Sequence, residues 1–181
     1  TVDVTETITA TTCSKAATQK TVTINALPTP VITGAIAACS GVTGSVYSVT
    51  DIAGHTYVWA VSGGTITAGQ NTSSITVTWG AAGAGTVDVT ETITATTCSK
   101  AATQKTVTVN ALPTITGTLI VCSGSTTQLT GSGTAAVSTP WVSASTGVAT
   151  VNSTGLVTAV SAGTSVITYT NINGCSTTAT V

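Results

Sequence analysis

One histidine, His55, is the side chain best suited to general acid–base chemistry near neutral pH, because imidazole titrates in that range. It stands in the turn sequence Gly54-His55-Thr56, and Asp51 precedes it by four residues, so an Asp–His pair is conceivable. No nucleophile elbow, pair of catalytic carboxylates or phosphate-cradling glycine loop accompanies it in the sequence. We therefore interpret His55 as a solvated turn residue and predict that the protein is not an enzyme.

The acidic residues are the next candidates, as ligands for a metal ion. Asp88 and Glu91 are three residues apart, and the same pair recurs as Asp3 and Glu6. On a strand this spacing points the two side chains to opposite faces, so they cannot chelate one cation together. Calcium takes about 6–8 oxygen ligands, whereas the chain has five acidic residues, and zinc is disfavoured because neither a CxxC nor an HxxxH spacing occurs. We predict no metal and no other cofactor, with calcium at a domain junction as the alternative.

The aromatic side chains suit either a stacking platform for a glycan or a hydrophobic core. All of them sit in segments where apolar and polar residues alternate, which favours the core. These residues are Tyr47, Tyr57, Trp59, Trp79, Trp141 and Tyr169. Two N-glycosylation sequons, Asn71-Thr72-Ser73 and Asn152-Ser153-Thr154, are interpreted as turns.

The elements that must position these residues are predicted to be strands. Hydrophobic residues make up 41% of the chain and charged residues 5%, and the abundant Thr, Val and Ile favour strands because they are β-branched. Segments 74–79 and 86–94 alternate with period 2, and glycine-containing turn sequences separate such segments. With four basic residues and a net charge of −1, the chain has no basic patch to neutralise the phosphates of a nucleic acid. No apolar stretch approaches the ~20 residues of a membrane helix.

An internal repeat divides the chain. Residues 1–29 recur at 86–114 with a single change, Ile24 to Val109, at an offset of 85 residues. A unit of that length with about seven short strands is typical of an immunoglobulin-like β-sandwich. We therefore predict an all-β fold, with tandem immunoglobulin-like sandwiches arranged as a rod.

Each copy of the repeat ends in Asn-Ala-Leu-Pro, and proline there ends a strand and stiffens a short linker. Residues 1–29 are then the C-terminal part of a truncated unit, residues 30–114 a complete unit, and residues 115–181 a third unit of different sequence.

The complete unit, residues 30–114, contains a set of short motifs: Tyr57-Val58-Trp59, Ser62-Gly63-Gly64-Thr65-Ile66, Gly69-Gln70, Ile75-Thr76-Val77-Thr78-Trp79-Gly80 and Gly85-Thr86-Val87. With these motifs the unit resembles the PKD-like, immunoglobulin-like domains of long secreted and surface proteins of Bacteroidota. Residues 115–181 contain Trp141, Val148-Ala149-Thr150-Val151, Gly155-Leu156-Val157-Thr158-Ala159 and Ala162-Gly163-Thr164-Ser165-Val166-Ile167. With these residues the third unit resembles bacterial immunoglobulin-like domains of group 2. Such motifs build cores and turns, so they identify a fold and no ligand.

The resemblance implies a non-catalytic stalk or fibre segment of a large surface adhesin of the gliding-motility kind, located outside the cell. Its partners are then neighbouring immunoglobulin-like domains of the same polypeptide or fibre, together with surface glycans or a host or substrate surface; nucleic acid and membrane insertion of this segment are not expected. Two alternatives stay open. Residues 1–29 complete an open sheet of a neighbouring subunit by strand addition and build a non-covalent filament, or the loops bind a glycan or protein.

Five cysteines agree with an extracellular setting, where thiols pair. Cys39 and Cys98 are 59 positions apart in the second unit, and Cys122 and Cys175 are 53 apart in the third. Each pair could tie the first strand to the last hairpin of its own sandwich, so we predict the disulfides Cys39–Cys98 and Cys122–Cys175. Cys13 is the repeat equivalent of Cys98, and its predicted partner lies upstream of this chain. The alternative is that the cysteines are reduced and buried.

Overall fold

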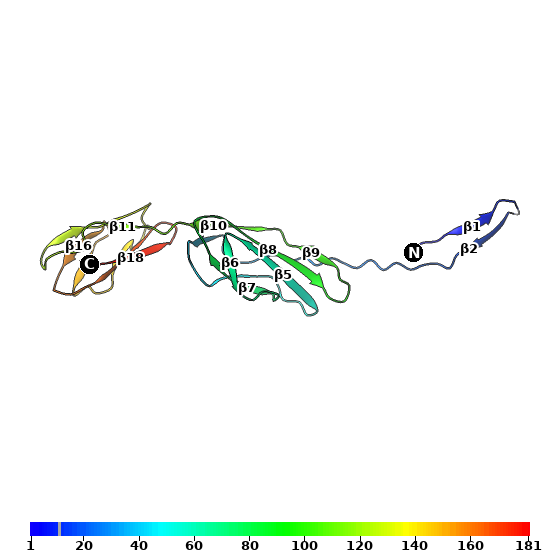
Figure 1. The fold of residues 1–181 in the computed structure, drawn as a ribbon, viewed down its shortest axis with the longest axis horizontal. Coiled ribbons are helices and arrows are strands. Elements are labelled where there is room, and N and C mark those ends of the chain that lie inside the picture. Colours follow the sequence, from blue (N-terminus) through cyan, green and yellow to red (C-terminus); the bar gives the residue numbers. More distant parts are fainter. Residues whose placement is uncertain (11) are drawn as a thin grey trace.

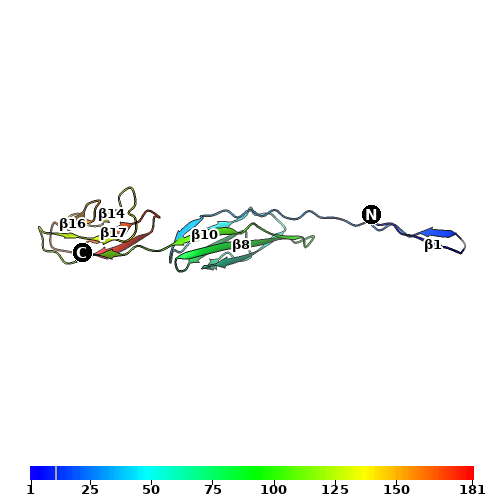
Figure 2. The ribbon, with the colours of Figure 1, turned by 90° about the horizontal axis from the view of Figure 1, so that it is seen from above.

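The fold is given by a computed structural model that describes residues 1–10 and 12–181. Every regular element in these residues is a β-strand, so the prediction of an all-β fold is confirmed. Figure 1 shows three parts of the chain following one another along the long axis of the view: an N-terminal hairpin, a middle unit and a C-terminal unit. The same order is visible from above in Figure 2. Among the described residues, no helix is long and apolar enough to cross a membrane.

The middle unit consists of two sheets. The five-stranded sheet has the order β3-β10-β8-β5, with β9 paired to β8. Its strands are β3 (Ala37–Cys39), β5 (His55–Ser62), β8 (Gly83–Ile93), β9 (Ser99–Ala101) and β10 (Lys105–Asn110). The second sheet has the order β4-β7-β6, formed by β4 (Ser45–Ser48), β6 (Gly64–Ala68) and β7 (Ser74–Trp79). Only the pairing of β3 with β10 is parallel within these sheets; the other ladders are antiparallel.

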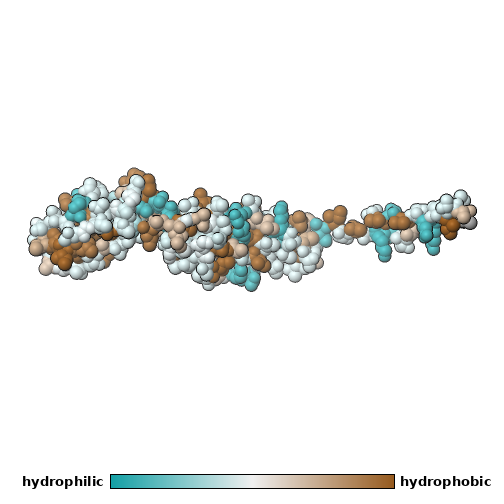
Figure 3. Space-filling view, turned by 45° about the horizontal axis from the view of Figure 1, so that its top comes forward, coloured by the Kyte–Doolittle hydropathy of each residue, from teal (hydrophilic) through white to brown (hydrophobic). Residues whose placement is uncertain are grey.

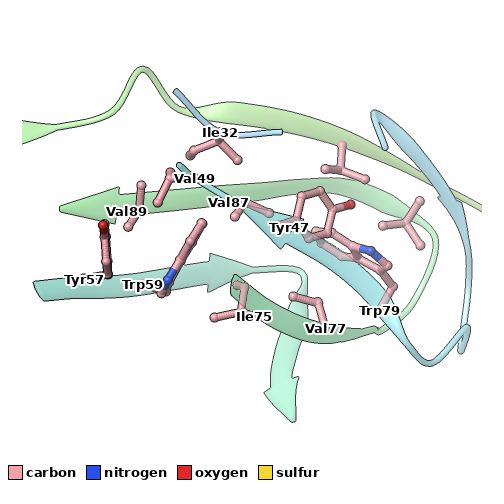
Figure 4. Close-up of a cluster of buried hydrophobic side chains, with 12 residues drawn as sticks. Ile32, Tyr47, Val49, Tyr57, Trp59, Ile75, Val77, Trp79, Val87 and Val89 are labelled. Carbon is pink, nitrogen blue, oxygen red and sulfur yellow. The ribbon is translucent and has the colours of Figure 1, made fainter. Parts of the chain in front are cut away.

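The core of the middle unit lies between its two sheets, because alternate residues of each strand point inward. In β7 the alternation buries Ile75, Val77 and Trp79, and in β8 it buries Val87 and Val89. Figure 4 shows side chains from both sheets meeting in this core. Gly85 faces the Trp79 indole so closely that a Cβ on residue 85 would lie 2.4 Å from the ring, which explains why a glycine interrupts the inward-facing row of β8.

The C-terminal unit is built from shorter strands. They are β11 (Ile115–Thr116), β12 (Thr126–Gln128), β13 (Thr130–Gly131), β14 (Trp141–Ser143), β15 (Ala149–Val151), β16 (Leu156–Ala159), β17 (Val166–Thr170) and β18 (Ser176–Thr180). They pair as β11-β13, β12-β16-β15 and β14-β17-β18. The core cluster includes Leu129, Val157 and Ile167 together with Trp141 and Tyr169, whose ring centroids are 4.6 Å apart.

The N-terminal hairpin repeats a piece of the middle unit in structure as well as in sequence. Strands β1 (Thr5–Ile8) and β2 (Cys13–Ala16) pair in the register of β8 and β9, so that Glu6 faces Lys15 as Glu91 faces Lys100. The apolar residues of this segment are nevertheless exposed, whereas their counterparts in β8 and β10 are buried. The exposed residues are Val2, Val4, Val22 and Ile24, and the buried counterparts are Val87, Val89, Val107 and Val109. Figure 3 shows hydrophobic side chains on the surface of this segment.

Candidate functional site

A disulfide joins the middle unit to the C-terminal unit. Cys39 at the end of β3 is bonded to Cys175, which lies in the turn between β17 and β18, with the two Cα atoms 5.6 Å apart. Both predicted disulfides are therefore wrong in their pairing, because Cys39 is bonded to neither Cys98 nor another cysteine of its own unit. Cys98 and Cys122 are free in this structure. The observed bond makes the junction between the two units a covalent cross-link.

Cys39 and Cys98 cannot meet because they lie at opposite ends of the same sheet. Cys39 is paired with Asn110 near the start of β8, whereas the carbonyl of Cys98 accepts a hydrogen bond from the Ile93 N–H at the end of β8. β8 has 11 residues, so its ends are roughly 30 Å apart at ~3.3 Å per residue. A disulfide requires Cα atoms within about 7 Å.

Cys122 and Cys175 are likewise separated along a strand. Val121, the neighbour of Cys122, lies in the same groove as Val181. Val181 follows the end of β18, whereas Cys175 precedes its start. The five residues of β18 place these two ends roughly 20 Å apart when the flanking residues are included.

The free cysteines do not support the reduced and buried alternative. Cys13 and Cys122 are exposed, and Cys98 is half-buried. The expected partner of Cys13 lies upstream of residue 1 and is absent from this chain, so that pairing stays a prediction. None of these three cysteines is therefore enclosed in a hydrophobic core.

His55 is hydrogen-bonded to the buried carboxyl group of Glu91, so the prediction that it is a solvated turn residue is wrong. It begins β5, and its Nδ1 lies 2.5 Å from Oε1 of Glu91 on the neighbouring strand β8. The side chain of Glu91 is 3% exposed and that of His55 is 13% exposed. Asp51 is exposed and contributes nothing to this pair. The two residues lie at the end of the inward-facing row that contains Val87 and Val89 in β8.

The pattern of β8 contains the signal that sequence reasoning overlooked. Glu91 follows Val87 and Val89 with period 2, so it belongs to the inward face of the strand, while Asp88 lies on the other face and accepts a hydrogen bond from Gln104. A carboxylate on an inward face needs a partner, and His55 is the residue that supplies it. The hydrogen bond between His55 and Glu91 joins β5 to β8 across the sheet.

The aromatic residues are buried, as predicted from their alternating pattern. The Tyr57 hydroxyl accepts a hydrogen bond from the Ile52 N–H and donates to the Thr50 carbonyl, at 2.9 and 3.2 Å. The Tyr47 hydroxyl and the Trp79 indole nitrogen are buried without a hydrogen-bond partner, and the two rings meet edge to face. Burial raises the pKa of Tyr47 above its usual value of 10.0. These side chains are not available as an exposed glycan platform.

Surface cavities are shallow. An apolar groove of about 200 Å³ in the C-terminal unit is lined by residues that include Leu119, Ile120, Val148 and Val181; small-molecule sites usually measure about 300–1,000 Å³. Among the described residues, no three His, Cys, Asp or Glu side chains are grouped so that they could hold a metal ion. Asn71 and Asn152 lie at turns, and the Asn152 side chain accepts hydrogen bonds from within its own turn.

A family model and a solved structure are similar to parts of this chain. Residues 24–109 match the family model of the PKD-like domain, which supports the resemblance of the middle unit to such domains. A crystal structure of the C-terminal 282-residue fragment of intimin, in complex with the intimin-binding domain of the translocated intimin receptor, is similar to this chain with 17% identity and a TM-score of 0.47. The similarity covers 87% of this chain and 64% of the intimin fragment, so the chain spans less than two thirds of that fragment. No curated protein matches the sequence.

Proposed function

We propose that this chain is a non-catalytic structural segment of a stalk or fibre, within a large secreted or cell-surface repeat adhesin. In this arrangement residues 1–29 are the C-terminal part of one PKD-like domain, residues 30–114 a complete PKD-like domain, and residues 115–181 an immunoglobulin-like domain of group 2. The single observation that carries the proposal is the Cys39–Cys175 disulfide, which ties one unit to the next.

A disulfide placed between units favours a mechanical role over a role in stabilising one fold. A bond within a sandwich would limit the unfolded states of that sandwich. A bond between units instead restricts how the two can bend or separate, and it persists only in an oxidising compartment. Both properties suit an extracellular rod that must transmit force from a cell to an attached surface, as in adhesins of the gliding-motility kind.

The low charge of the chain also fits a stalk. The 5% of charged residues leaves no basic surface for nucleic acid, and the aromatic residues that a glycan site would use are buried in the two cores. Its partners are therefore proposed to be neighbouring immunoglobulin-like domains, with the target surface bound elsewhere along the adhesin.

A second candidate function is favoured by the exposed apolar face of the N-terminal hairpin. Val2 is 57% exposed and Ile24 is 92% exposed, although their counterparts in the middle unit are buried. Such a face requires covering, either by the rest of its own unit in a longer polypeptide or by a neighbouring subunit that accepts the hairpin into an open sheet. The second possibility makes the protein a subunit of a non-covalent filament.

The mass of the native polypeptide under reducing and fully denaturing conditions distinguishes the two. A covalent stalk is expected to migrate at many times the 17.6 kDa of this chain. A native polypeptide near 17.6 kDa would refute the stalk and support the filament. Labelling of intact cells with a membrane-impermeant reagent tests the location independently, since an intracellular stalk segment would stay unlabelled.

A further inference from the structure

The free thiol of Cys98 occupies the same structural position in the middle unit as Cys175 does in the C-terminal unit. The Ile93 N–H donates to the carbonyl of Cys98 at 2.9 Å, and the Asn171 N–H donates to the carbonyl of Cys175 at 2.9 Å. Each cysteine directly follows a residue with positive φ: Thr97 at 56° and Gly174 at 75°. Both cysteines therefore end the turn of a strand hairpin and enter the strand that follows.

The partner of Cys175 also has a counterpart, because Cys39 and Cys122 occupy equivalent turns. Each begins a Cys-Ser-Gly sequence. Ser40 Oγ donates to the Gly80 carbonyl at 2.9 Å, and Ser123 Oγ donates to the Val160 carbonyl at 3.1 Å. In both turns the glycine has a positive φ, and the carbonyl of the cysteine accepts a hydrogen bond from the residue after the glycine. We call these the turn cysteines, and Cys98 and Cys175 the hairpin cysteines.

The two kinds of cysteine lie at opposite ends of a unit. In the middle unit the turn cysteine Cys39 is at the end bonded to the C-terminal unit, and the hairpin cysteine Cys98 is at the other end of β8. Figure 1 shows that this other end, with β9, faces the side on which the N-terminal hairpin lies. A preceding PKD-like unit would therefore present its own turn cysteine toward Cys98.

From these positions we infer that Cys98 is the site of an inter-unit disulfide with the turn cysteine of a preceding PKD-like unit. The observed Cys39–Cys175 bond is then one instance of a rule by which the turn cysteine of each unit is bonded to the hairpin cysteine of the next. The inference rests on the proposed tandem arrangement and adds the covalent chemistry of its junctions. It also assigns Cys13, the repeat equivalent of Cys98, to a bond with a unit one position further upstream.

The linker between the preceding unit and the middle unit is similar in length to the linker at the observed junction, which allows this bond. In the middle unit Cys39 is opposite Asn110, and Asn25 is the equivalent of Asn110, so an upstream turn cysteine would lie beside Asn25. From Asn110 the chain continues through Ala-Leu-Pro-Thr to Ile115. The linker from Asn25 to Ile32, the residue of the middle unit that corresponds to Ile115, is two residues longer. Two residues add at most about 7 Å, and the turn that ends at Cys98 is one residue longer than the turn that ends at Cys175.

Formation of this disulfide needs an oxidant, which a small-molecule disulfide can supply. The Cys98 thiol and the upstream thiol together lose two protons and two electrons as their S–S bond forms. Oxidised glutathione accepts both and leaves as two molecules of reduced glutathione, by thiol–disulfide exchange through a mixed disulfide. Cys98 is half-buried and lies outside the hydrophobic core cluster of the middle unit.

The experiment restores the preceding unit. A copy of residues 30–85 is fused before Thr1 of the full chain, so that it completes a unit with residues 1–29, and the protein is refolded in a glutathione redox buffer. The four lysines, Lys15, Lys20, Lys100 and Lys105, make trypsin informative. One fragment ends at Lys15 and contains the added turn cysteine and Cys13, residues 21–100 contain Cys39 and Cys98, and residues 106–181 contain Cys122 and Cys175.

We expect non-reducing mass spectrometry to find these three fragments covalently linked in one product. Cys98→Ser is expected to release the fragment that ends at Lys15, whereas Cys13→Ser, a change in the same local sequence, is expected to leave the product intact. A separate N-terminal fragment in the parent protein, with its added cysteine free or bonded to Cys13, would overturn the inference. Hydrogen exchange of the added unit distinguishes failure of the disulfide inference from failure of the proposed domain arrangement. If the added unit is protected from exchange but not disulfide-bonded to Cys98, the disulfide inference alone is refuted. If the added unit is unprotected, the proposed domain arrangement is refuted.

Discussion

Reduction of the Cys39–Cys175 disulfide is expected to lengthen the chain that can be extended by force. When the protein is pulled from its two termini, the bond carries the load directly from β3 to the start of β18. The sequence between the two cysteines, which includes most of both units, is then shielded from the force. Only the residues before Cys39 and after Cys175 can be extended while the bond is intact.

The size of the effect follows from the loop that the bond closes. The two cysteines are 136 positions apart, and an extended chain spans at most about 3.3–3.6 Å per residue. Reduction therefore releases about 450–490 Å of additional contour length. Without the bond, unfolding of the two units should appear as separate steps in an extension trace, because each has its own core.

Single-molecule force spectroscopy with and without a reducing agent measures this length. Cys175→Ser should reproduce the reduced trace in the absence of reductant. Cys122→Ser removes an exposed free cysteine and should behave as the parent chain. The reasoning is refuted if the oxidised parent chain reaches the full extension of the reduced one, since the two units would then not be bridged.

The remaining predictions concern the middle unit and are measured by urea unfolding followed through tryptophan fluorescence. Tyr47→Phe removes a buried hydroxyl that has no hydrogen-bond partner and should stabilise the unit by about 1 kcal/mol. Tyr57→Phe deletes two hydrogen bonds and should destabilise the unit by about 1–2 kcal/mol. Equal effects of the two substitutions would contradict the assigned hydrogen-bond partners. Burial raises the pKa of Tyr47, so the unfolded state releases the phenol proton at a lower pH than the folded state. The free energy of unfolding is therefore unaffected by this group below pH ~10 and decreases as the pH rises further. The Tyr47→Phe variant should lose less stability at alkaline pH than the parent chain, and an equal loss would argue against titration of Tyr47. His55→Ala leaves the buried carboxyl group of Glu91 without its hydrogen-bond partner and should destabilise the unit by about 1–3 kcal/mol; a change below about 0.5 kcal/mol, the size typical of surface substitutions, would mean that the pair is solvated. Gly85→Ala places a Cβ 2.4 Å from a buried indole ring and should cost about 1–3 kcal/mol, with a shifted tryptophan emission; an unchanged midpoint would show that the ring can move.

The local pattern of the sequence was sufficient to predict the buried aromatic residues and the strands β7, β8 and β10 of the middle unit, whereas the strands expected near residues 116–121 and 137–142 are reduced to β11 (Ile115–Thr116) and β14 (Trp141–Ser143). Period-2 alternation in β7 and β8 depends only on which side chains point inward, and the inward face is apolar along β7 and along β8 as far as Val89. Trp79 and Tyr47 are buried for this reason. Glu91 obeys the same alternation, so its burial was also encoded locally, although its partner was not.

The partners of His55 and Cys39 were decided by the tertiary structure. His55 meets Glu91 because β5 and β8 are neighbours in one sheet, in a register that the residues of neither strand reveal alone. Cys39 meets Cys175 because the end of β3 faces the next unit, while the equally plausible Cys98 lies at the far end of the sheet. Spacing along a sequence records how many residues separate two thiols, whereas a disulfide depends on the distance between them in space, which is set by the direction of the strands and the order of the units.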